Sequence, residues 1–154
     1  SKIKFQCNYL VLISKLIDGT FPEYSSFIPK DNEQKLTINT KFFAGAIDRV
    51  ATVTVDKFRA VKIRIDDKVL EITASGEAKG AANENLLFSD EDENFCSFAG
   101  EEVSIGFNPK YISDVLSALE SAKVDIYFKD AFSPVLIKTT DNSADSFVVM
   151  PVKV

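Results

Sequence analysis

A strand, a helix and a second strand follow one another in the stretch VSIGFNPKYISDVLSALESAKVDIYF, residues 103–128. Val103–Gly106 is a short apolar run, and Val124–Phe128 is another, as expected of buried strands. Between them, Asn108 and Pro109 predict a helix start, because asparagine caps free backbone N–H groups and proline suits the first helical position. The helix then shows an apolar stripe at Ile112, Val115, Leu116 and Leu119.

The same order of elements occurs earlier in the chain, which predicts an internal repeat. Leu36–Asn39 is a short strand, and Thr40 is expected as the N-cap of a helix whose apolar stripe is Phe43, Ala46, Ile47 and Val50. Three strands complete each copy: Phe58–Ile65, Val69–Ala74 and Ala82–Phe88 in the first, and Val124–Phe128, Val135–Thr139 and Phe147–Met150 in the second. The sequence therefore predicts a β-α-β-β-β repeat in an α+β fold, with two helices packed on one side of mainly antiparallel sheet.

The residues before the repeat indicate a separate unit. Residues 2–13 alternate loosely between apolar and polar and predict one or two strands, and Asp18–Pro22 has the glycine and proline of a turn. Residues 23–34 show little periodicity and form a connection longer than most inside a compact domain. We expect a linker and a domain boundary there. Between the two copies, Ser89–Gly100 is expected to be a solvated acidic loop.

The composition excludes several classes of function. The chain has 154 residues, is 45% hydrophobic, carries a net charge of −5 and contains no histidine. Without histidine, no Ser-His, Cys-His or His-metal arrangement is possible. The spacing of Cys7 and Cys96 fits no zinc or redox motif, so free thiols in a reducing cytoplasm are expected.

Targeting signals are not evident in the sequence. No apolar run approaches the roughly 18 residues of a transmembrane helix. Residues 5–16 contain too many polar side chains for a signal peptide. The chain starts at Ser1 without a methionine, and we expect it to be cut from a longer protein.

The C-terminal residues Val148–Val154 are apolar at nearly every position. Pro151 cannot donate a hydrogen bond to a neighbouring strand, so strand pairing should weaken there. Met150–Val154 is therefore expected to form an exposed apolar lip that lines a groove. A last core strand is the alternative for Val152 and Val154.

Several stretches together resemble the bacterial sliding clamp, the beta subunit of DNA polymerase III. They keep the family order and cover nearly the whole chain. The matching stretches are Ser14–Tyr24, Ile28–Lys30, Ala46–Ala51, Lys57–Lys62, Ile105–Asn108, Tyr111 with Asp114–Leu116, Ser133–Val135 and Val148–Pro151.

The resemblance implies a fold, a domain division and a function. Residues 35–154 would be the third, C-terminal domain of the DNA-clamp fold, 23–34 a linker, and 1–22 the closing strands of the second domain. The whole protein would be a head-to-tail homodimeric ring in the bacterial cytoplasm, a processivity factor of DNA replication that encircles duplex DNA without reading its sequence. It would need no cofactor and would have no catalytic site.

The resemblance also implies a groove for partner peptides. Polymerase subunits, the clamp loader and repair proteins would dock short motifs there, in which a glutamine is followed by leucine and phenylalanine. The matching positions are Pro22, Phe58, Asn108, Tyr111, Pro134, Val148, Met150 and Pro151, with altered residues at Phe27, Phe132, Val152 and Val154. Apolar walls would supply burial, and polar groups such as Asn108 would fix orientation.

Two further surfaces follow from the same resemblance. Lys41, Arg49 and Lys110 lie on or beside the two helices and would contact the DNA backbone, with a solvated helix face as the alternative. Thr52, Val53, Glu84 and Leu86 would form the dimer interface, with an ordinary edge strand as the alternative.

Two other interpretations are open to test. Asp90, Asp92, Asn94 and Glu101 have the spacing of a calcium loop, but Phe95 replaces the required glycine and the flanks predict strands, so we expect no metal. A small α+β enzyme using carboxylates such as Asp130 or Asp141, or an interaction domain that forms no ring, are the alternatives to the clamp.

Overall fold

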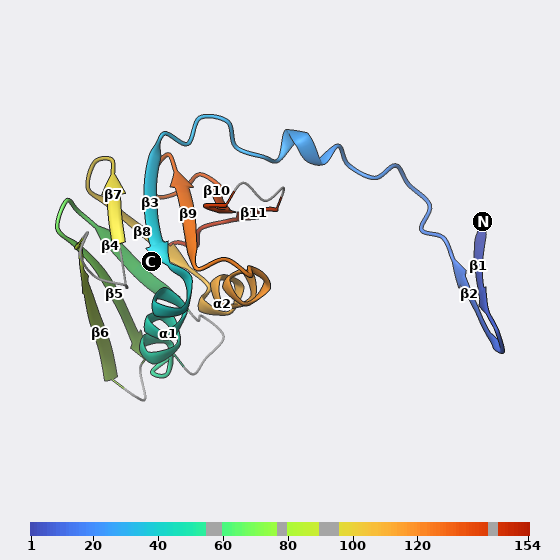
Figure 1. The fold of residues 1–154 in the computed structure, drawn as a ribbon, viewed down its shortest axis with the longest axis horizontal. Helices are drawn as coiled ribbons and strands as arrows, with labels where there is room; N and C mark the ends of the chain where they lie inside the picture. The colour runs from blue at the N-terminus through green and yellow to red at the C-terminus, as the bar shows by residue number, and fades with distance from the viewer. Residues whose placement is uncertain (55–59, 77–79, 90–95, 142–144) are drawn as a thin grey trace.

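The computed structural model describes residues 1–54, 60–76, 80–89, 96–141 and 145–154 (Figure 1). Within these ranges the chain forms strands and two α-helices, as predicted for an α+β fold. In chain order the elements are β1 (Lys2–Cys7), β2 (Leu10–Lys15), the 3₁₀ helix η1 (Tyr24–Ser26), β3 (Gln34–Asn39), α1 (Thr40–Ala51), β4 (Val61–Ile65), β5 (Val69–Gly76), β6 (Gly80–Leu87), β7 (Cys96–Ala99), β8 (Val103–Phe107), α2 (Pro109–Ala118), β9 (Lys123–Phe128), β10 (Val135–Thr139) and β11 (Ser146–Val149).

The predicted repeat is confirmed by the element order. The first copy is β3-α1-β4-β5-β6 and the second is β8-α2-β9-β10-β11. Strands β3–β11 form two sheets rather than one, with orders β11-β10-β9-β3-β7 and β6-β5-β4-β8. The first strand of each copy pairs with the second strand of the other copy, β3 with β9 and β8 with β4, both antiparallel. The two copies are therefore interlocked and form one body.

The two helices lie side by side and pack against the sheets (Figure 1). Helix α1 contacts strands of both sheets, and α2 contacts α1 and β11. The predicted stripe of α1 is buried, as are Ile112, Leu116 and Leu119 near α2, whereas Val115 is only half-buried. One core thus joins both copies.

The helix starts follow the expected chemistry with one correction. Asn108 caps α2 as predicted, and its Oδ1 accepts a hydrogen bond from Lys110 N at 3.0 Å. The prediction of Thr40 as the cap of α1 is wrong by one residue. Asn39 is the N-cap and accepts from Phe42 N at 3.0 Å. Thr40 is buried, and its hydroxyl donates to the Ser121 carbonyl instead.

The insertion between the copies is not entirely a loop. Cys96–Ala99 forms β7, which pairs with β3 at the edge of the five-stranded sheet, and Cys96 is buried. The alternation of Cys96 and Phe98 toward the core was too short a pattern to predict this strand. Asp90, Asp92 and Asn94, at which we expect no metal despite the spacing of a calcium loop, and the start of the predicted strand at Phe58 lie outside the described residues.

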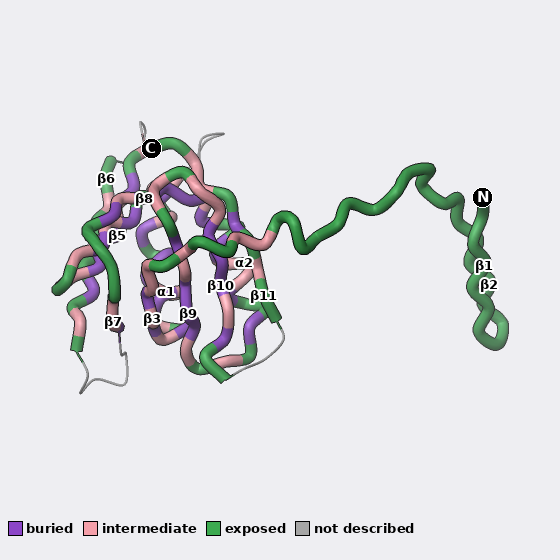
Figure 2. Tube along the Cα trace, turned by 90° about the horizontal axis from the view of Figure 1, so that it is seen from above, coloured by how far each residue is buried: buried purple, intermediate pink, exposed green. Residues whose placement is uncertain are grey.

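The N-terminal residues form a hairpin apart from this body. Strands β1 and β2 pair with each other, and every residue from 1 to 27 is exposed (Figure 2). Side chains with exposed apolar surface include Phe5, Leu10, Leu12 and Ile13. Among the described residues, no helix is long and apolar enough to cross a membrane.

Candidate partner-docking site

One end of the five-stranded sheet collects several of the predicted docking residues. Strands β10 and β11 pair with Val135 opposite Val149, so the same register continued by one residue brings Pro134 opposite Met150. Met150 is 58% exposed and Phe132, in the preceding loop, is 75% exposed. These large, exposed apolar side chains thus lie just before β10 and just after β11, at the same end of the two paired strands.

Helix α2 brings a third exposed side chain to the same copy of the repeat. The Asn108 cap and Pro109 fix the helix start, and Tyr111 follows in the first turn with 57% of its surface exposed. Helix α2 packs against β11, the strand that leads to Met150. The side-chain oxygen of Asn108 accepts the capping hydrogen bond from Lys110 N. This oxygen is therefore already engaged in holding the helix start.

The loop between β9 and β10, residues 129–134, is an ordered turn. The Asp130 carboxylate accepts hydrogen bonds from the backbone N–H groups of Phe132 and Ser133 and from the Ser133 hydroxyl. These bonds, the one from Phe132 N foremost, hold the pKa of Asp130 below its usual value. A carboxylate occupied in this way is poorly suited to act as a general base, which counts against the carboxylate-enzyme alternative.

The C-terminal residues cross from one sheet to the other, so the expected lip is only partly free. The Val152 N–H donates to the Gly106 carbonyl on β8 at 2.8 Å. Gly106 is needed for this approach, because a Cβ there would lie 2.4 Å from the Val152 carbonyl oxygen. Met150 therefore lies free before the bridge, while Val152 is half-buried in it.

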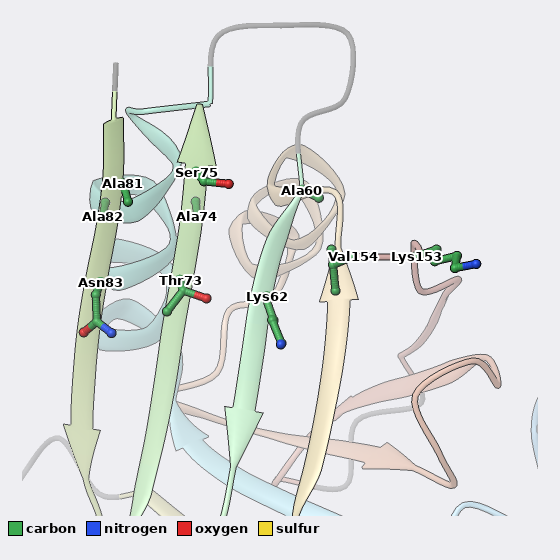
Figure 3. A pocket seen from close by; sticks show the side chains of 10 residues that line it. All are labelled: Ala60, Lys62, Thr73, Ala74, Ser75, Ala81, Ala82, Asn83, Lys153 and Val154. Atoms are coloured by element: carbon green, nitrogen blue, oxygen red, sulfur yellow. The ribbon is translucent and has the colours of Figure 1, made fainter. Parts of the chain in front are cut away.

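Val154 lies at the four-stranded sheet rather than beside Phe132. It borders a shallow hollow of about 620 Å³ on that sheet, together with Ala60 and Lys62 of the β4 region and Thr73 and Asn83 of the neighbouring strands (Figure 3). Lys153 points away from the centre of this hollow (Figure 3). The predicted set thus divides between the ends of two sheets.

The remaining docking candidates lie on the N-terminal side. Phe27 is exposed and borders a hollow of about 310 Å³ together with Pro29, Ser133 and Pro134. Pro22 lies in the exposed segment before η1 and does not line this hollow. Phe58 lies outside the described residues.

The three predicted DNA-contacting cations differ in their surroundings. Arg49 is paired with Glu84 through two hydrogen bonds, one of them 3.0 Å long from Nε. Lys110 is paired with Asp114 one turn later in α2, at 2.6 Å. Lys41 is exposed in the first turn of α1 and lines a hollow that also contains Glu120. Nearby carboxylates therefore reduce the positive potential of the helix layer.

The predicted dimer residues lie near β6, one of the two edge strands of the four-stranded sheet. Glu84 faces Arg49 of α1, so one candidate interface residue contacts one candidate DNA residue. Leu86 is 3% exposed and packs in the core, so only its backbone can reach a partner strand. Thr52 donates its hydroxyl to the Arg49 carbonyl at the end of α1, and Val53 follows it.

Comparison with known proteins assigns this arrangement to a family. The sequence-family model described as "DNA polymerase III beta subunit, C-terminal domain" matches residues 25–153. The chain belongs to this family. It is 54% identical to the beta sliding clamp of Rickettsia bellii over all of its own length and 41% of that relative. It is 34% identical to the beta sliding clamp of Caulobacter vibrioides, covering 99% of the chain and 39% of that relative.

Solved beta subunits share the fold, which confirms the predicted DNA-clamp fold. The sliding clamp of Bartonella birtlesii, crystallised bound to griselimycin, superposes with a TM-score of 0.87 at 36% identity. The match covers 99% of this chain and 39% of that one. The chain thus spans about two fifths of the beta subunits that it matches.

Several residues that organise this candidate site were not predicted from the sequence. Asn32 and Gln34 bond to carbonyls at the ends of the 129–134 loop, and Gly106 receives the C-terminal residues. Their contacts are far apart in sequence, so spacing gives no signal for them.

Among the described residues, no group of three or more His, Cys, Asp or Glu side chains could hold a metal ion. Burial raises the pKa of Cys96 to about 12, which keeps this thiol protonated and unreactive.

Proposed function

We propose that the chain works as part of a DNA sliding clamp, a processivity factor that holds a replicative polymerase on duplex DNA in the bacterial cytoplasm. The observation that carries the proposal is membership of the beta-subunit family over residues 25–153. The protein would act by binding and would catalyse no reaction. The whole ring, with its DNA and its second subunit, requires more than the part of the beta subunit that this chain spans.

We further propose the predicted domain division. Residues 35–154 would be the third clamp domain, 23–34 the linker, and 1–22 the closing strands of the second domain. The interlocked repeat supports the first assignment because its core is shared between both copies. The exposed apolar side chains of β1 and β2 support the last, because a hairpin of this kind needs a partner surface to be stable.

The proposed docking surface consists of Phe132, Pro134, Tyr111, Val148 and Met150, with Phe27 nearby. Short motifs of polymerase subunits, the clamp loader and repair proteins would bury apolar side chains against it. Each fully buried apolar side chain contributes about 1.5–3 kcal/mol. Exposure of Phe132, Tyr111 and Met150 in the same copy of the repeat supports this surface.

The proposed DNA contacts would come from Lys41, Arg49 and Lys110 and would be made to phosphates only. Sliding requires contacts that are independent of sequence, since base-specific bonds would stall the ring. The pairing of Arg49 and Lys110 with carboxylates supports weak, exchangeable contacts. Ring closure would use the β6 edge, with Thr52, Val53, Glu84 and the Leu86 backbone.

A peptide titration tests the docking surface. A synthetic peptide with glutamine followed by leucine and phenylalanine is titrated into the 154-residue chain and into Met150→Ala. We expect Met150→Ala to weaken binding by about tenfold, since it removes most of one exposed apolar contact. Leu87→Ala is the matched control, because Leu87 is an exposed apolar side chain on β6 and lies outside the surface.

Two results would contradict the docking proposal: no binding by the unchanged chain, or equal binding by Met150→Ala. Deletion of Met150–Val154 should abolish binding, but it also removes the Val152–Gly106 bridge, so the single substitution is the sharper test. For the clamp itself, the full-length protein should be retained on circular DNA and lost from linear DNA. Equal retention on both would exclude a ring.

A further inference from the structure

The loop that carries Phe132 is held from within by one carboxylate. Asp130 Oδ1 accepts from Phe132 N at 2.8 Å and from Ser133 N at 2.7 Å. Its Oδ2 accepts from Ser133 Oγ at 2.9 Å. A side chain that bonds its own backbone two and three residues ahead fixes a tight turn. The Phe132 backbone is therefore set by Asp130, while the Phe132 ring remains exposed.

The same loop is held from outside by the segment that enters the domain. Asn32 Nδ2 donates to the Tyr127 carbonyl, which precedes the loop, and to the carbonyl of Pro134, the last residue of the loop, both at 2.9 Å. Gln34 Nε2 donates to the Lys129 carbonyl at 2.9 Å. Asn32 comes shortly after Phe27, which borders a hollow with Pro134. One amide thus links the segment carrying Phe27 to the loop carrying Phe132 and Pro134.

Fixing the loop in advance has a consequence for binding. A peptide that docks on a mobile loop must order that loop, and this ordering reduces the affinity. A loop already held by side-chain bonds avoids most of that cost. We propose that Asp130 and Asn32 are positioning residues of the docking surface, which preset the 129–134 loop and act on an apolar peptide only through Phe132 and Pro134. This inference rests on the proposed function of that surface.

The first copy of the repeat offers a matched control. In the turn between β4 and β5, Asp66 Oδ1 accepts from Lys68 N at 2.8 Å and Val69 N at 2.9 Å. The two aspartates make the same kind of turn, and neighbouring backbone N–H groups lower the pKa of both. No proposed docking residue lies in the Asp66 turn. Asp66→Ala therefore removes equivalent bonds without touching the docking surface.

The test compares affinities for the synthetic peptide with glutamine, leucine and phenylalanine, measured on the 154-residue chain and its variants. Asp130→Ala should weaken binding by about three- to tenfold, the effect of one or two side chains that must be ordered on binding. Asn32→Ala should weaken it in the same range. Asp130→Asn should restore the affinity, because an asparagine oxygen still accepts both backbone bonds. Asp66→Ala should bind as the unchanged chain does.

A spectroscopic measurement separates positioning from general instability. Backbone amide exchange at Phe132 and Ser133 should be slow in the unchanged chain and fast in Asp130→Ala, while exchange in the helices stays slow in both. Asp66→Ala should leave exchange at Phe132 slow.

The outcomes distinguish this inference from the proposed function. If the unchanged chain does not bind the peptide, the proposed docking surface is wrong and this inference with it. If the unchanged chain binds and Asp130→Ala binds equally well, only the positioning role is overturned. If Asp130→Asn loses as much affinity as Asp130→Ala while amide exchange at Phe132 stays slow, the loop is still held, the charge contacts the peptide directly, and the positioning role is again overturned.

Discussion

The two copies of the repeat use the same turn chemistry but build turns of different length. In the first copy, residues 66–68 join β4 to β5, and in the second, residues 129–134 join β9 to β10. Both turns are fixed by an aspartate that accepts bonds from the backbone ahead of it. The longer turn adds Phe132 and Pro134 at the surface. The repeat thus supplies the scaffold, and the added residues supply the candidate site.

The first strands of the two copies differ in a related way. Thr37 on β3 and Gly106 on β8 lie at the same distance before the N-cap asparagine of their helices. Thr37 pairs with Ser97 of β7, whereas Gly106 pairs with Val152. Thr37 also donates to the buried carboxylate of Asp125, at 2.6 Å, while Gly106 must lack a side chain to admit the C-terminal residues. Equivalent sheet edges are thus covered by an inserted strand in one copy and by the chain's last residues in the other.

The largest expected effect tests whether both copies share one core. Ile47 in α1 and Leu116 in α2 occupy equivalent buried positions. Ile47→Ala and Leu116→Ala should each lower the free energy of unfolding by about 2–5 kcal/mol, measured by urea denaturation. Both variants should unfold in a single transition. Ile17→Ala, in the exposed N-terminal segment, should change stability by less than about 0.5 kcal/mol. Separate transitions for the two copies would contradict the shared core.

A smaller effect separates the scaffold from the site. Asn39→Ala and Asn108→Ala each remove a helix cap, so each should cost about 1 kcal/mol of unfolding free energy. Only Asn108→Ala should also weaken binding of the test peptide, because Asn108 begins the helix that carries Tyr111. Urea denaturation and peptide titration measure the two effects. Equal binding losses in both variants would mean that the docking surface is not confined to the second copy.

The smallest expected effect concerns the two turn aspartates and pH. The folded-state pKa values of Asp66 and Asp130 are lowered, so their contribution to stability is present above the unfolded pKa of about 3.9. That contribution is lost as the pH falls through the folded pKa. The stability difference between the unchanged chain and Asp66→Ala or Asp130→Ala should therefore shrink between pH 6 and pH 2. A difference that is constant over this range would show that the charged form is not what the turns stabilise.

Local patterns in the sequence predicted much of the fold. Helical spacing and the Asn108-Pro109 start gave α2 nearly to the residue, and most strands were placed within a few residues. The N-cap of α1 is Asn39 and not the predicted Thr40, because both residue types can serve as caps and only the backbone geometry separates them. Strand β7 was missed because four residues next to an acidic run carry little periodicity.

The candidate site was predicted less completely. Exposure of Tyr111, Phe132 and Met150 agrees with a surface role. Val154 lies at a different sheet from Phe132, and Arg49 and Lys110 are paired with carboxylates. Residue type alone could not show that Arg49 meets Glu84, because the two are far apart in the sequence. Lys110 and Asp114, in contrast, are four residues apart on one predicted helix, a spacing at which side chains meet.

By itself, the sequence determined the elements and their repeated order, because hydrophobic periodicity and helix caps act between near neighbours in the chain. Only the tertiary structure decided that β3 joins β9 and β8 joins β4, since strands of similar apolar pattern can pair in several ways. It also decided that Asn32 holds the loop beside Phe132 and that Gly106 receives Val152. Those contacts join segments that are far apart in the sequence and come together only when the single core is buried. The pattern of neighbouring residues therefore does not predict them.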